Sequence, residues 1–257
     1  MRVGALGHGR GKRIRSRVRG LTAAATATLA SPEGDGRGVL VASGDIPGGG
    51  RLHLVRHGED FEILLGEEQL MGSWASRSEE ALATLVFERL GGRARSVLIG
   101  GLGMGFTLAA ARAALPDGAT IVLAELVPSI LAWARGPLAH IFRGSLDDPR
   151  VSIEMRDVHD IIDGKPGRFD AILLDVDNGP EGLVSIANER LYCNWGLRAA
   201  YAALRDGGIL AVWSAWPDDD FPARLRAAGF AVDEVSVDPD GTGRDPPHTI
   251  WLATRPA

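Results

Sequence analysis

The sequence is poor in cysteine and has no long apolar run. Cys193 is the single cysteine among the 257 residues. One cysteine excludes an intramolecular disulfide and leaves no cysteine cluster for a metal ion. This suits a reducing compartment, so we expect a cytoplasmic protein without a bound metal. No segment is long and apolar enough to cross a bilayer, and we therefore expect no membrane partner.

An excess of positive charge is also missing. The chain has 28 Lys and Arg against 33 Asp and Glu, for a formal net charge of -5, and this balance predicts no nucleic-acid partner. Basic residues nevertheless lie among glycines in residues 2–19. Such blocks are usually solvated extensions, although contact with an acidic partner or nucleic acid is an alternative. Together with the glycine-rich segment 31–50, they predict a disordered tail and linker over residues 1–50.

The most informative segment is an apolar run that opens into glycines, VLIGGLGMG at residues 97–105. An alanine-rich helical segment follows it, and then a second apolar run that ends at Glu125. A strand leading to a glycine turn at the N-terminus of a helix is typical of the nucleotide-binding half of a parallel sheet. Glu125 lies about 20 residues after the glycines, where a carboxylate accepts hydrogen bonds from ribose hydroxyls. The segment therefore predicts a ligand that contains adenosine.

The spacing of the glycines separates two kinds of adenosine ligand. A dinucleotide fingerprint that begins at Gly101 and Gly103 needs glycine or alanine where this chain has Phe106. The third small residue is needed for close packing around a pyrophosphate. The spacing thus favours a ligand without pyrophosphate, such as S-adenosylmethionine. The alternative is that the glycines only make a tight turn between strand and helix.

Three predicted strands end in a carboxylate. The strand over residues 120–125 ends at Glu125, that over 151–157 ends at Asp157, and that over 169–175 ends at Asp175. Ligands of open parallel sheets bind at the carboxyl ends of strands near the switch in strand order, so we expect these acids to converge on one crevice. The sequence predicts an α/β domain, with helices over residues 128–135, 189–204 and 221–228, a turn over 205–208 and further strands over 209–213, 230–237 and 248–253.

A hairpin precedes this domain. Residues 51–66 alternate between apolar and polar side chains around a turn at His57-Gly58, which predicts two antiparallel strands. We assign residues 51–76 to a small β-hairpin domain and residues 77–257 to the α/β domain. Arg56-His57-Gly58 also resembles the opening motif of histidine phosphatases, in which the histidine is phosphorylated. That motif needs a strand followed by a helix, whereas strand alternation resumes at Phe61, so a phosphatase is kept only as an alternative.

Several of these segments together resemble a known family. They are VLIGGLGMG, the acid Glu125, MRDV around Asp157, FDAILLDVDNGPEG and LRDGGILAVW, with the hairpin and a helix start at Ser78 ahead of them. They look like the class I methyltransferase-type fold in its polyamine aminopropyltransferase (spermidine synthase) branch. The resemblance implies a Rossmann-like methyltransferase fold, with a seven-stranded, mostly parallel sheet, helices on both of its faces and a small β-hairpin domain in front. It also implies a homodimer.

The resemblance implies a role for each matched residue. Asp175 would hold the acceptor amine and help to take its proton, and Asp177 or Asn178 stands near a second acid of the same segment. Residues 177–187 would form a gate over the site. The glycine loop would wrap the amino-acid end of the donor, Glu125 would hold the ribose, and Asp157 with the Val158 backbone would contact adenine. The implied cofactor-binding residues are Gly100, Gly101, Gly103, Gly105, Glu125, Asp157, Val158 and Asp175, and the implied catalytic residues are Asp175 and Asp177.

The chain departs from the family at three places. Gly103 stands where the family's loop carries an Asp that binds the cationic arm of decarboxylated S-adenosylmethionine. Because that charge pair is lost, we expect intact S-adenosylmethionine to be favoured over the decarboxylated form. The family's Tyr-Gln pair falls at about Ala81 and Leu82, which implies a different acceptor pocket. Met71 stands near a position where the family commonly has a glutamine.

Two of the candidate features have alternatives. Asp175 either anchors and deprotonates the acceptor or caps the following loop through backbone N–H groups. The tryptophans Trp195, Trp213 and Trp216 either line a pocket for a cationic acceptor or belong to the core.

The sequence therefore predicts an enzyme that uses S-adenosylmethionine. It would transfer an aminopropyl, aminocarboxypropyl or methyl group from the sulfonium to a small amine or amino-acid-like acceptor. The sulfonium is already activated, so a positioned nucleophile and a proton acceptor are sufficient for the reaction. Three alternatives remain: cyclisation of the donor with release of methylthioadenosine, a non-catalytic protein that binds adenosine or a partner, and the histidine phosphatase.

Overall fold

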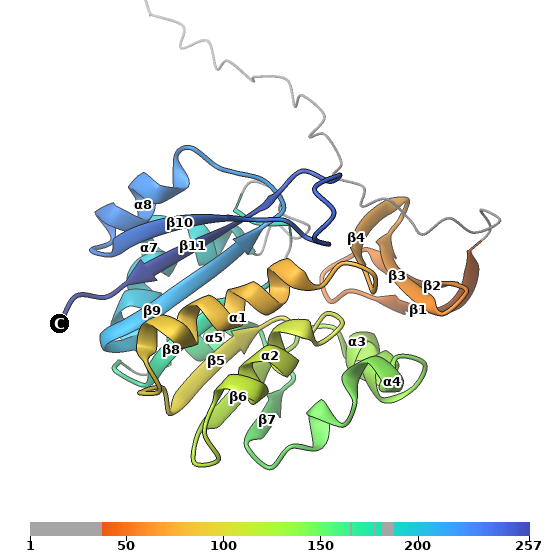
Figure 1. Ribbon diagram of the computed structural model, residues 1–257, viewed down its shortest axis with the longest axis horizontal. Helices are drawn as coiled ribbons and strands as arrows, with labels where there is room; N and C mark the ends of the chain where they lie inside the picture. Colours follow the sequence, from red (N-terminus) through yellow and green to blue (C-terminus); the bar gives the residue numbers. More distant parts are fainter. Residues whose placement is uncertain (1–37, 165, 177, 181–187) are drawn as a thin grey trace, which may run out of the picture.

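The computed structural model describes residues 38–164, 166–176, 178–180 and 188–257, and these form two sheets that lie next to each other (Figure 1). A four-stranded sheet lies at one end of the molecule, and a seven-stranded sheet with its helices makes up the rest. Helix α1 (Arg77–Leu90) leads from the first sheet onto the second. No helix within these ranges is long and apolar enough to span a bilayer.

The small sheet is an antiparallel meander with the strand order β1-β2-β3-β4. Alternate side chains of its second strand, Leu52 and Leu54, are buried, as expected for a sheet with one face against a core. The hairpin predicted around residues 57–60 is present as the second and third strands. The strands are β1 (Val39–Asp45), β2 (Arg51–His57), β3 (Asp60–Leu65) and β4 (Glu68–Gly72).

Strand β1 corrects the predicted linker. The sequence predicts tail and linker over residues 1–50, but Val39–Asp45 pairs with β2, so the small sheet begins before residue 51. As an edge strand, β1 leaves Val39 and Leu40 exposed at 57% and 59%. The clear alternation of apolar and polar residues that burial produces in a central strand is therefore missing from its sequence. The predicted tail at residues 1–37 lies outside the described residues.

The large sheet has the order β10-β11-β9-β8-β5-β6-β7 and confirms the predicted seven-stranded, mostly parallel sheet. Neighbours from β9 to β7 are parallel, whereas β11 is antiparallel to both β9 and β10. Chain order reverses between β5 and β8, and open α/β sheets bind ligands at such a switch point. The strands are β5 (Ser96–Gly100), β6 (Thr120–Ala124), β7 (Val151–Glu154), β8 (Phe169–Leu174), β9 (Leu204–Ser214), β10 (Ala231–Val237) and β11 (His248–Thr254).

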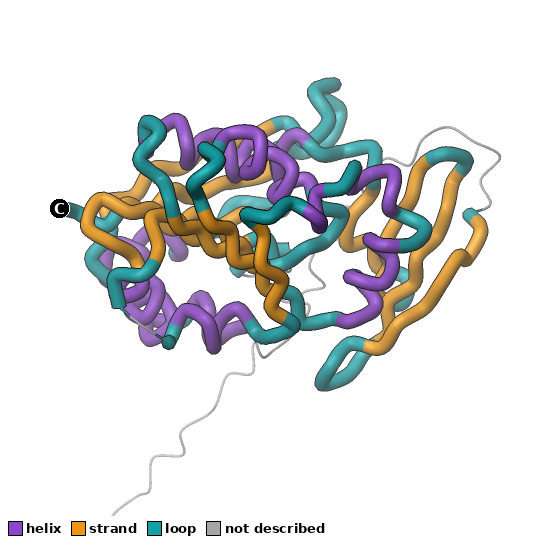
Figure 2. Tube along the Cα trace, turned by 90° about the horizontal axis from the view of Figure 1, so that it is seen from below, coloured by secondary structure: helices purple, strands orange, loops and turns teal. Residues whose placement is uncertain are grey.

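Helices cover both faces of this sheet (Figure 2). Successive residues of β5 point to opposite faces, and both sets are apolar: Ile99 packs in one cluster with α1 and α2, and Leu98 packs in the other with α5, α7 and α8. The helices after α1 are α2 (Phe106–Ala114), α3 (Pro128–Arg135), α4 (Ala139–Phe142), α5 (Val158–Ile162), α6 (Glu189–Tyr192), α7 (Asn194–Ala203) and α8 (Phe221–Ala227), and η1 (Ser145–Asp147) is a 3₁₀ turn.

The segment after residue 188 differs from the prediction in two places. The predicted helix over residues 189–204 is divided at Cys193, whose extended backbone separates α6 from α7. The predicted turn over residues 205–208 lies inside the long strand β9. There the register against β8 slips between Leu204 and Ile209, and Gly207 takes a φ of 75°. The turn residues therefore bulge out of a strand instead of preceding it.

Candidate active site

The loop after β5 turns at glycines because larger residues do not fit. Gly101 has a φ of 88°, and a Cβ there would lie 2.2 Å from the backbone oxygen of Asp175. Gly105 has a φ of 83°, and its Cβ would lie 2.4 Å from the ring of Phe142. Side chains are strained in this left-handed region of φ, so the loop can adopt this path close to its neighbours only with glycine at these two positions. The requirements of the turn thus account for Gly101 and Gly105 without a ligand.

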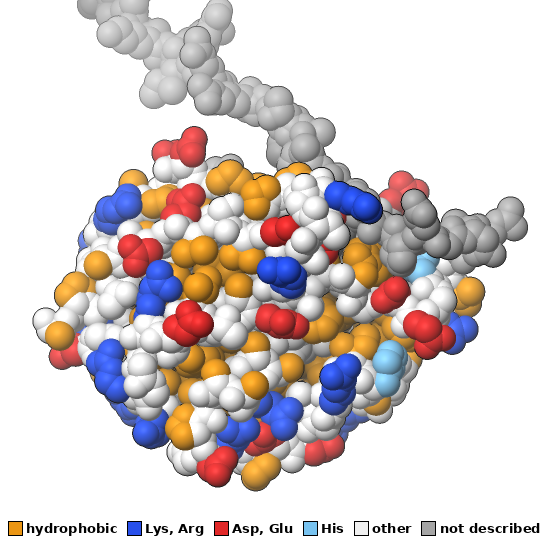
Figure 3. All heavy atoms as spheres, in the orientation of Figure 1, with side chains coloured by type: hydrophobic (Ala, Val, Ile, Leu, Met, Phe, Trp, Pro, Cys, Tyr) orange, Lys and Arg blue, Asp and Glu red, His pale blue; other side chains and the backbone are white. Residues whose placement is uncertain are grey.

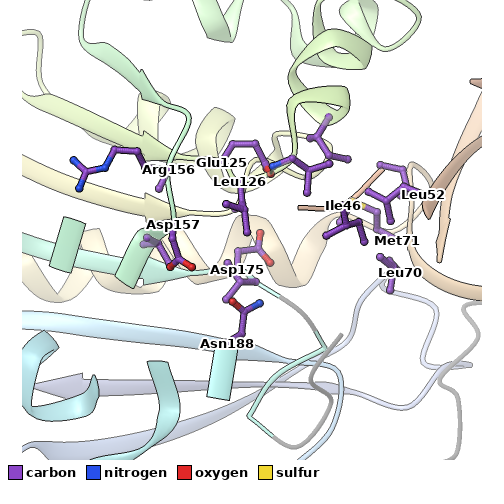
Figure 4. A pocket seen from close by; sticks show the side chains of 18 residues that line it. Ile46, Leu52, Leu70, Met71, Glu125, Leu126, Arg156, Asp157, Asp175 and Asn188 are labelled. Carbon is purple, nitrogen blue, oxygen red and sulfur yellow. Dashed lines mark hydrogen bonds between the residues drawn. The ribbon is translucent and has the colours of Figure 1, made fainter. Parts of the chain in front are cut away.

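A pocket opens where this loop, the strand ends and the small sheet meet (Figure 4). This first pocket encloses about 850 Å³ of empty space, which includes the solvent at its open mouth. Apolar side chains from the small sheet and its loops lie on one side, and Asp157 lies on the other. The predicted residues that line the first pocket are Gly101, Gly103, Glu125, Asp157, Val158 and Asp175. Gly100 and Gly105 are not among its described lining residues, and Asp177 lies outside the described part of the chain.

Glu125 follows the end of β6 and is held by backbone amides. One carboxylate oxygen accepts a hydrogen bond from Leu102 N at 2.9 Å, and the other accepts one from Val127 N at 2.7 Å. Burial raises the pKa of Glu125, and the backbone hydrogen bonds oppose that rise. A carboxylate has about four lone-pair positions, so acceptor capacity remains for a ligand hydroxyl. Glu125 therefore joins two loops of the first pocket and still faces it.

Asp157 has partners of its own. It lies at the N-terminus of α5, where its Oδ1 accepts a hydrogen bond from His159 N at 2.8 Å. Its Oδ2 pairs with the guanidinium of Arg190 on α6. The position at the edge of the first pocket agrees with a contact to an adenine base. Adenine would have to compete with the Arg190 guanidinium for Oδ2 of Asp157.

Asp175 directly follows β8 and lies at the junction of two cavities. Its Oδ2 accepts a hydrogen bond from the Thr107 hydroxyl at 2.7 Å, and its backbone N–H donates to Gly100 O at 2.9 Å. Burial raises the pKa of Asp175 above its usual range. Among the described residues, its side-chain partner is this hydroxyl of α2 and not a backbone N–H of the following loop. The capping alternative concerns a loop in which residues 177 and 181–187 lie outside the described part of the chain.

Glu79 is a second carboxylate that the sequence analysis did not identify as a site residue. It lies in the first turn of α1, and its Oε2 accepts a hydrogen bond from the Ser78 hydroxyl at 2.5 Å. Burial, and next the negative charge of Asp175, raise the pKa of Glu79. Two carboxylates that interact in this way do not both ionise easily. Only the packing of α1 shows that Glu79 faces inward, because acids in the first turn of a helix are usually solvated.

The second pocket lies on the other side of Asp175 and holds about 550 Å³ of empty space. Asp175, Gly103 and Met71 line both pockets, so the Asp175 carboxylate lies between them. On the outer face seen in Figure 3, acidic and basic side chains are mixed. The second pocket instead has two carboxylates and no Lys or Arg among its described lining residues, which are Leu70, Met71, Glu79, Gly103, Met104, Phe106, Asp175, Asn178 and Trp213. Its charge therefore suits a cation.

A third, smaller cavity of about 340 Å³ continues past Glu79 to Gln69 and His248. Gln69 is only 5% exposed, and its side-chain nitrogen and oxygen have no hydrogen-bond partner among the described residues. Buried polar groups are normally paired, so Gln69 has capacity for a polar ligand group or water. Gln69 lies two residues before Met71, near which the family resemblance places a glutamine. The third cavity therefore has room for a water, or for one small polar group of a ligand in the second pocket.

The three candidate tryptophans have different positions. Trp213 lines the second pocket and the third cavity, while its indole N–H donates to the Ser78 hydroxyl at 3.0 Å. Trp216 packs against the core, and Trp195 is 55% exposed and stacks against His159. Trp213 thus belongs both to the core and to the pocket wall.

The phosphatase motif does not have the structure it requires. His57 ends β2 and is followed by the turn into β3 instead of a helix. Its Nε2 lies 2.7 Å from Oε2 of Glu62 within the small sheet. His57 is not among the described lining residues of the three cavities. The structure therefore does not favour the phosphatase alternative. No group of three or more His, Cys, Asp or Glu suited to a metal ion occurs among the described residues either.

The sheet order, the glycine loop at the switch point and the acids at the strand ends give the chain a methyltransferase-type fold. Comparison with known sequences narrows this class. The chain is 32% identical over 196 residues to the polyamine aminopropyltransferase of Mycobacterium tuberculosis, a match that covers 72% of this chain and 36% of the relative. It is 31% identical over 122 residues to the polyamine aminopropyltransferase of Nitrosomonas europaea, over 48% of this chain and 36% of the relative.

Solved structures agree on the fold. Spermidine synthase from Thermotoga maritima matches with a TM-score of 0.67 and 20% identity over 84% of this chain and 72% of that one. A spermidine synthase in complex with the transition state analogue AdoDATO matches with a TM-score of 0.70 and 19% identity, over 84% and 73%. No protein-family model matches the chain. The chain is thus similar in sequence to polyamine aminopropyltransferases and shares the fold of spermidine synthases, and it spans about a third of the length of the curated relatives it matches, at 36%.

Proposed function

We propose that the protein is an aminopropyltransferase that moves the aminopropyl group of decarboxylated S-adenosylmethionine to a small amine and releases methylthioadenosine. The observation that carries this proposal is the position of Asp175, whose carboxylate lies between the first and second pockets. A carboxylate at that junction is in reach of a donor on one side and an acceptor on the other. The names of the relatives, polyamine aminopropyltransferase, support the same reaction.

The first pocket fits the adenosine part of the donor. Its wall is apolar at Val158, next to Asp157, which suits the face of a purine ring. Glu125 has lone pairs left for the ribose hydroxyls after its two backbone hydrogen bonds. We assign adenine to the end of the pocket at Asp157 and Val158. The glycine loop then lies beside the sulfonium.

The reaction needs a neutral nitrogen on the acceptor. The donor supplies an activated carbon–sulfur bond, which breaks with its electron pair going to sulfur as the acceptor nitrogen forms the new carbon–nitrogen bond. Asp175 takes a proton from the acceptor nitrogen, so that its lone pair is free to attack. A carboxylate with a raised pKa is a stronger proton acceptor than an ordinary one, and burial provides that rise. The Thr107 hydrogen bond orients the carboxylate for this transfer.

Charge in the second pocket changes the expected form of the donor. The sequence predicts intact S-adenosylmethionine because Gly103 lacks the family's acid. Gly103, however, shares the second pocket with Glu79 and Asp175, and no described Lys or Arg lines that pocket. The carboxylate of an intact donor would face two acids without a cationic partner. We therefore infer the decarboxylated donor and, with it, aminopropyl transfer over methyl or aminocarboxypropyl transfer.

The acceptor belongs to the second pocket and the third cavity. Asp175 suits the reacting amine, and the unpaired amide of Gln69 suits a further polar group of the acceptor. A separate acceptor pocket also speaks against cyclisation of the donor, which needs no second substrate. The homodimer and the cytoplasmic location expected from the sequence stay predictions.

A product assay tests the proposal. The protein is incubated with decarboxylated or intact S-adenosylmethionine, with and without a panel of small primary amines, and a reaction without protein is the control. Chromatography measures methylthioadenosine and S-adenosylhomocysteine, and mass spectrometry measures the amine. We expect methylthioadenosine only when an amine is present, together with an amine that has gained one aminopropyl group. S-adenosylhomocysteine would indicate methyl transfer, amine-independent methylthioadenosine would indicate cyclisation or hydrolysis, and binding without any product would indicate a non-catalytic protein.

A further inference from the structure

Glu79 introduces a second acid that the reaction itself does not require. Asp175 alone is sufficient to take the proton of the acceptor. Glu79 nevertheless lies in the second pocket beside Asp175, although two neighbouring carboxylates in a partly buried site repel each other. The described lining residues of the pocket include no Lys or Arg that would neutralise the pair. An arrangement with this cost is explained when a cationic group of a ligand binds between the acids.

We propose that Glu79 selects the donor: its carboxylate binds the terminal ammonium of the aminopropyl arm and repels the extra carboxylate of intact S-adenosylmethionine. This assignment rests on the proposed function, because it takes a sulfonium donor in the first pocket as given. Glu79 thereby supplies from α1 the negative charge that the glycine loop lacks at Gly103.

The shape of the loop allows the arm to reach Glu79. Gly103 lines both pockets, and it has no side chain to separate them. A Cβ at Gly103 would lie 3.1 Å from Cε and 3.2 Å from Sδ of Met71, so a larger residue would fill the space between the loop and Met71. An arm that leaves the first pocket over Gly103 therefore enters the second pocket, where Glu79 and Asp175 lie.

A buried hydrogen-bond network fixes the Glu79 carboxylate. The Ser78 hydroxyl is 2.5 Å from Glu79 Oε2, 3.0 Å from the indole nitrogen of Trp213 and 2.8 Å from Nδ1 of His248. Ser78 is fully buried and His248 is 4% exposed. The indole N–H donates to Ser78, so Ser78 gives its single proton to Glu79 only if His248 donates from Nδ1. Ser78, Trp213 and His248 are thus positioning residues for Glu79.

Proton release is a consequence of this arrangement. The titratable groups that face Glu79 are Asp175 at the end of β8, Glu80 on α1 and, through Ser78, His248 on β11. Burial lowers the pKa of His248 to about 4, so it is neutral near pH 7. The raised pKa of Glu79 lets the free protein hold a proton in the acid pair near neutral pH. An arriving ammonium favours the ionised form and displaces that proton.

Calorimetry with the two donors tests the assignment in Glu79→Gln. Glu88→Gln is the matched control, because Glu88 also belongs to α1 and is exposed. For the wild type and the control we expect decarboxylated S-adenosylmethionine to bind at least 10-fold more tightly than the intact form. In Glu79→Gln that preference should fall by 10-fold or more. Titration in two buffers with different ionisation enthalpies should show proton release on binding for the wild type, and its loss in the variant.

The outcomes separate this inference from the proposed function. An unchanged donor preference in Glu79→Gln, or a variant in which only the KM of the amine rises, would overturn the role in donor selection. Binding is measured without turnover, so a wild type with the expected preference and no product would leave this inference standing and remove the transferase. Glu79→Asp keeps the charge and should retain part of the preference and the proton release. If Glu79 had only a structural role, donor preference would not decrease in the order wild type, Glu79→Asp, Glu79→Gln.

Discussion

The acids of the two pockets have different kinds of partners. In the first pocket, Glu125 accepts hydrogen bonds from two backbone amides, and Asp157 accepts one from a backbone amide and pairs with Arg190. In the second pocket, Asp175 and Glu79 each accept a hydrogen bond from one hydroxyl group, and they raise the cost of ionising each other. The first pair of acids is held by fixed donors, and the second pair is left short of positive charge.

This difference indicates different uses of the same chemical group. A carboxylate fixed by backbone N–H groups has a defined position and suits recognition of neutral groups such as hydroxyls. A carboxylate with few partners and a raised pKa suits a cation or a proton in transit. We thus propose that Glu125 and Asp157, which have several hydrogen-bond partners, position the adenosine part of the donor. Glu79 and Asp175, which have fewer described partners, would bind the charged arm and take the proton of the acceptor nitrogen. Substitutions that neutralise single acids should therefore affect ligand binding in the first pocket and turnover or donor preference in the second.

The largest effect is expected at Asp175. Asp175→Asn keeps the shape and removes the proton acceptor, so turnover should fall by about 10²–10⁴-fold, the usual range for a lost general base. Affinity for decarboxylated S-adenosylmethionine should fall far less than turnover, because the adenosine part binds in the first pocket and Glu79 still faces the ammonium of the arm. Release of methylthioadenosine measures turnover, and calorimetry measures binding.

Asp163→Asn is the matched control, since Asp163 is an exposed acid at the end of α5. It should retain wild-type turnover. Full turnover in Asp175→Asn would show that Asp175 has no role in the mechanism. An equal loss of turnover and donor affinity would show that Asp175 acts in donor binding, like the acids of the first pocket.

A smaller effect is expected at Glu125. Glu125→Gln loses a charge-assisted hydrogen bond to the ribose, worth roughly 1.5–3 kcal/mol, so methylthioadenosine should bind about 10-fold or more weakly. The amide NH₂ of the variant would also face either Leu102 N or Val127 N, where the carboxylate now accepts. The control is Glu154→Gln at the neighbouring strand end. Unchanged binding in Glu125→Gln would show that this strand end does not hold the ribose.

The main features of the first pocket were predictable from the sequence. Glycines at the end of an apolar run, and acids at the ends of the following strands, have a position in a parallel sheet that is fixed by chain order. Glu125, Asp157 and Asp175 therefore meet at one edge of the sheet, as the strand order requires. These residues needed no knowledge of helix rotation or side-chain packing.

The acid pair of the second pocket was not predictable in the same way. Glu79 and Glu80 are adjacent in the first turn of α1, and only the packing of α1 against α2, β9 and β11 decides which of them faces inward. The same limit applies to Arg190, because the extended backbone at Cys193 that ends α6 interrupts an otherwise continuous helical pattern. Tertiary packing, and not local pattern, places these residues.

The network beneath the second pocket should make stability depend on pH. Burial lowers the pKa of His248 from its ordinary 6.5 to about 4. Protonation therefore favours the unfolded chain, and the stabilising contribution of neutral His248 is complete above about pH 6.5 and is lost as the pH falls toward 4. Glu79 and Asp175 have raised pKa values and give the opposite slope, since their ionisation at higher pH disfavours the fold.

Comparison of the wild type with His248→Gln isolates this term. Between pH 7 and pH 5, the free energy of unfolding of the wild type should fall by about 1–2 kcal/mol more than that of the variant. Chemical denaturation at several pH values measures the difference. His53→Gln is the control, because His53 lies in the small sheet outside this network. Parallel pH profiles for the wild type and His248→Gln would show that His248 is not held neutral by burial.

The smallest effect is expected at Arg190, which tests whether the fixed partners of the first pocket compete with the ligand. Arg190 is partly exposed, with 43% of its side chain accessible, and exposed ion pairs contribute about 0.2–1 kcal/mol. Arg190→Ala should free one oxygen of Asp157 for the amino group of adenine, so methylthioadenosine should bind up to about 5-fold more tightly at low salt. Salt weakens the ion pair in the wild type, so the gain should shrink at about 0.5 M salt.

The control Arg198→Ala removes an exposed arginine of α7 and should leave binding unchanged. The matching analogue with hypoxanthine in place of adenine lacks the amino group and should show no gain. Weaker binding in Arg190→Ala would instead show that Arg190 contacts the ligand. Equal gains for the adenine and hypoxanthine compounds would show that Asp157 does not recognise the amino group of adenine.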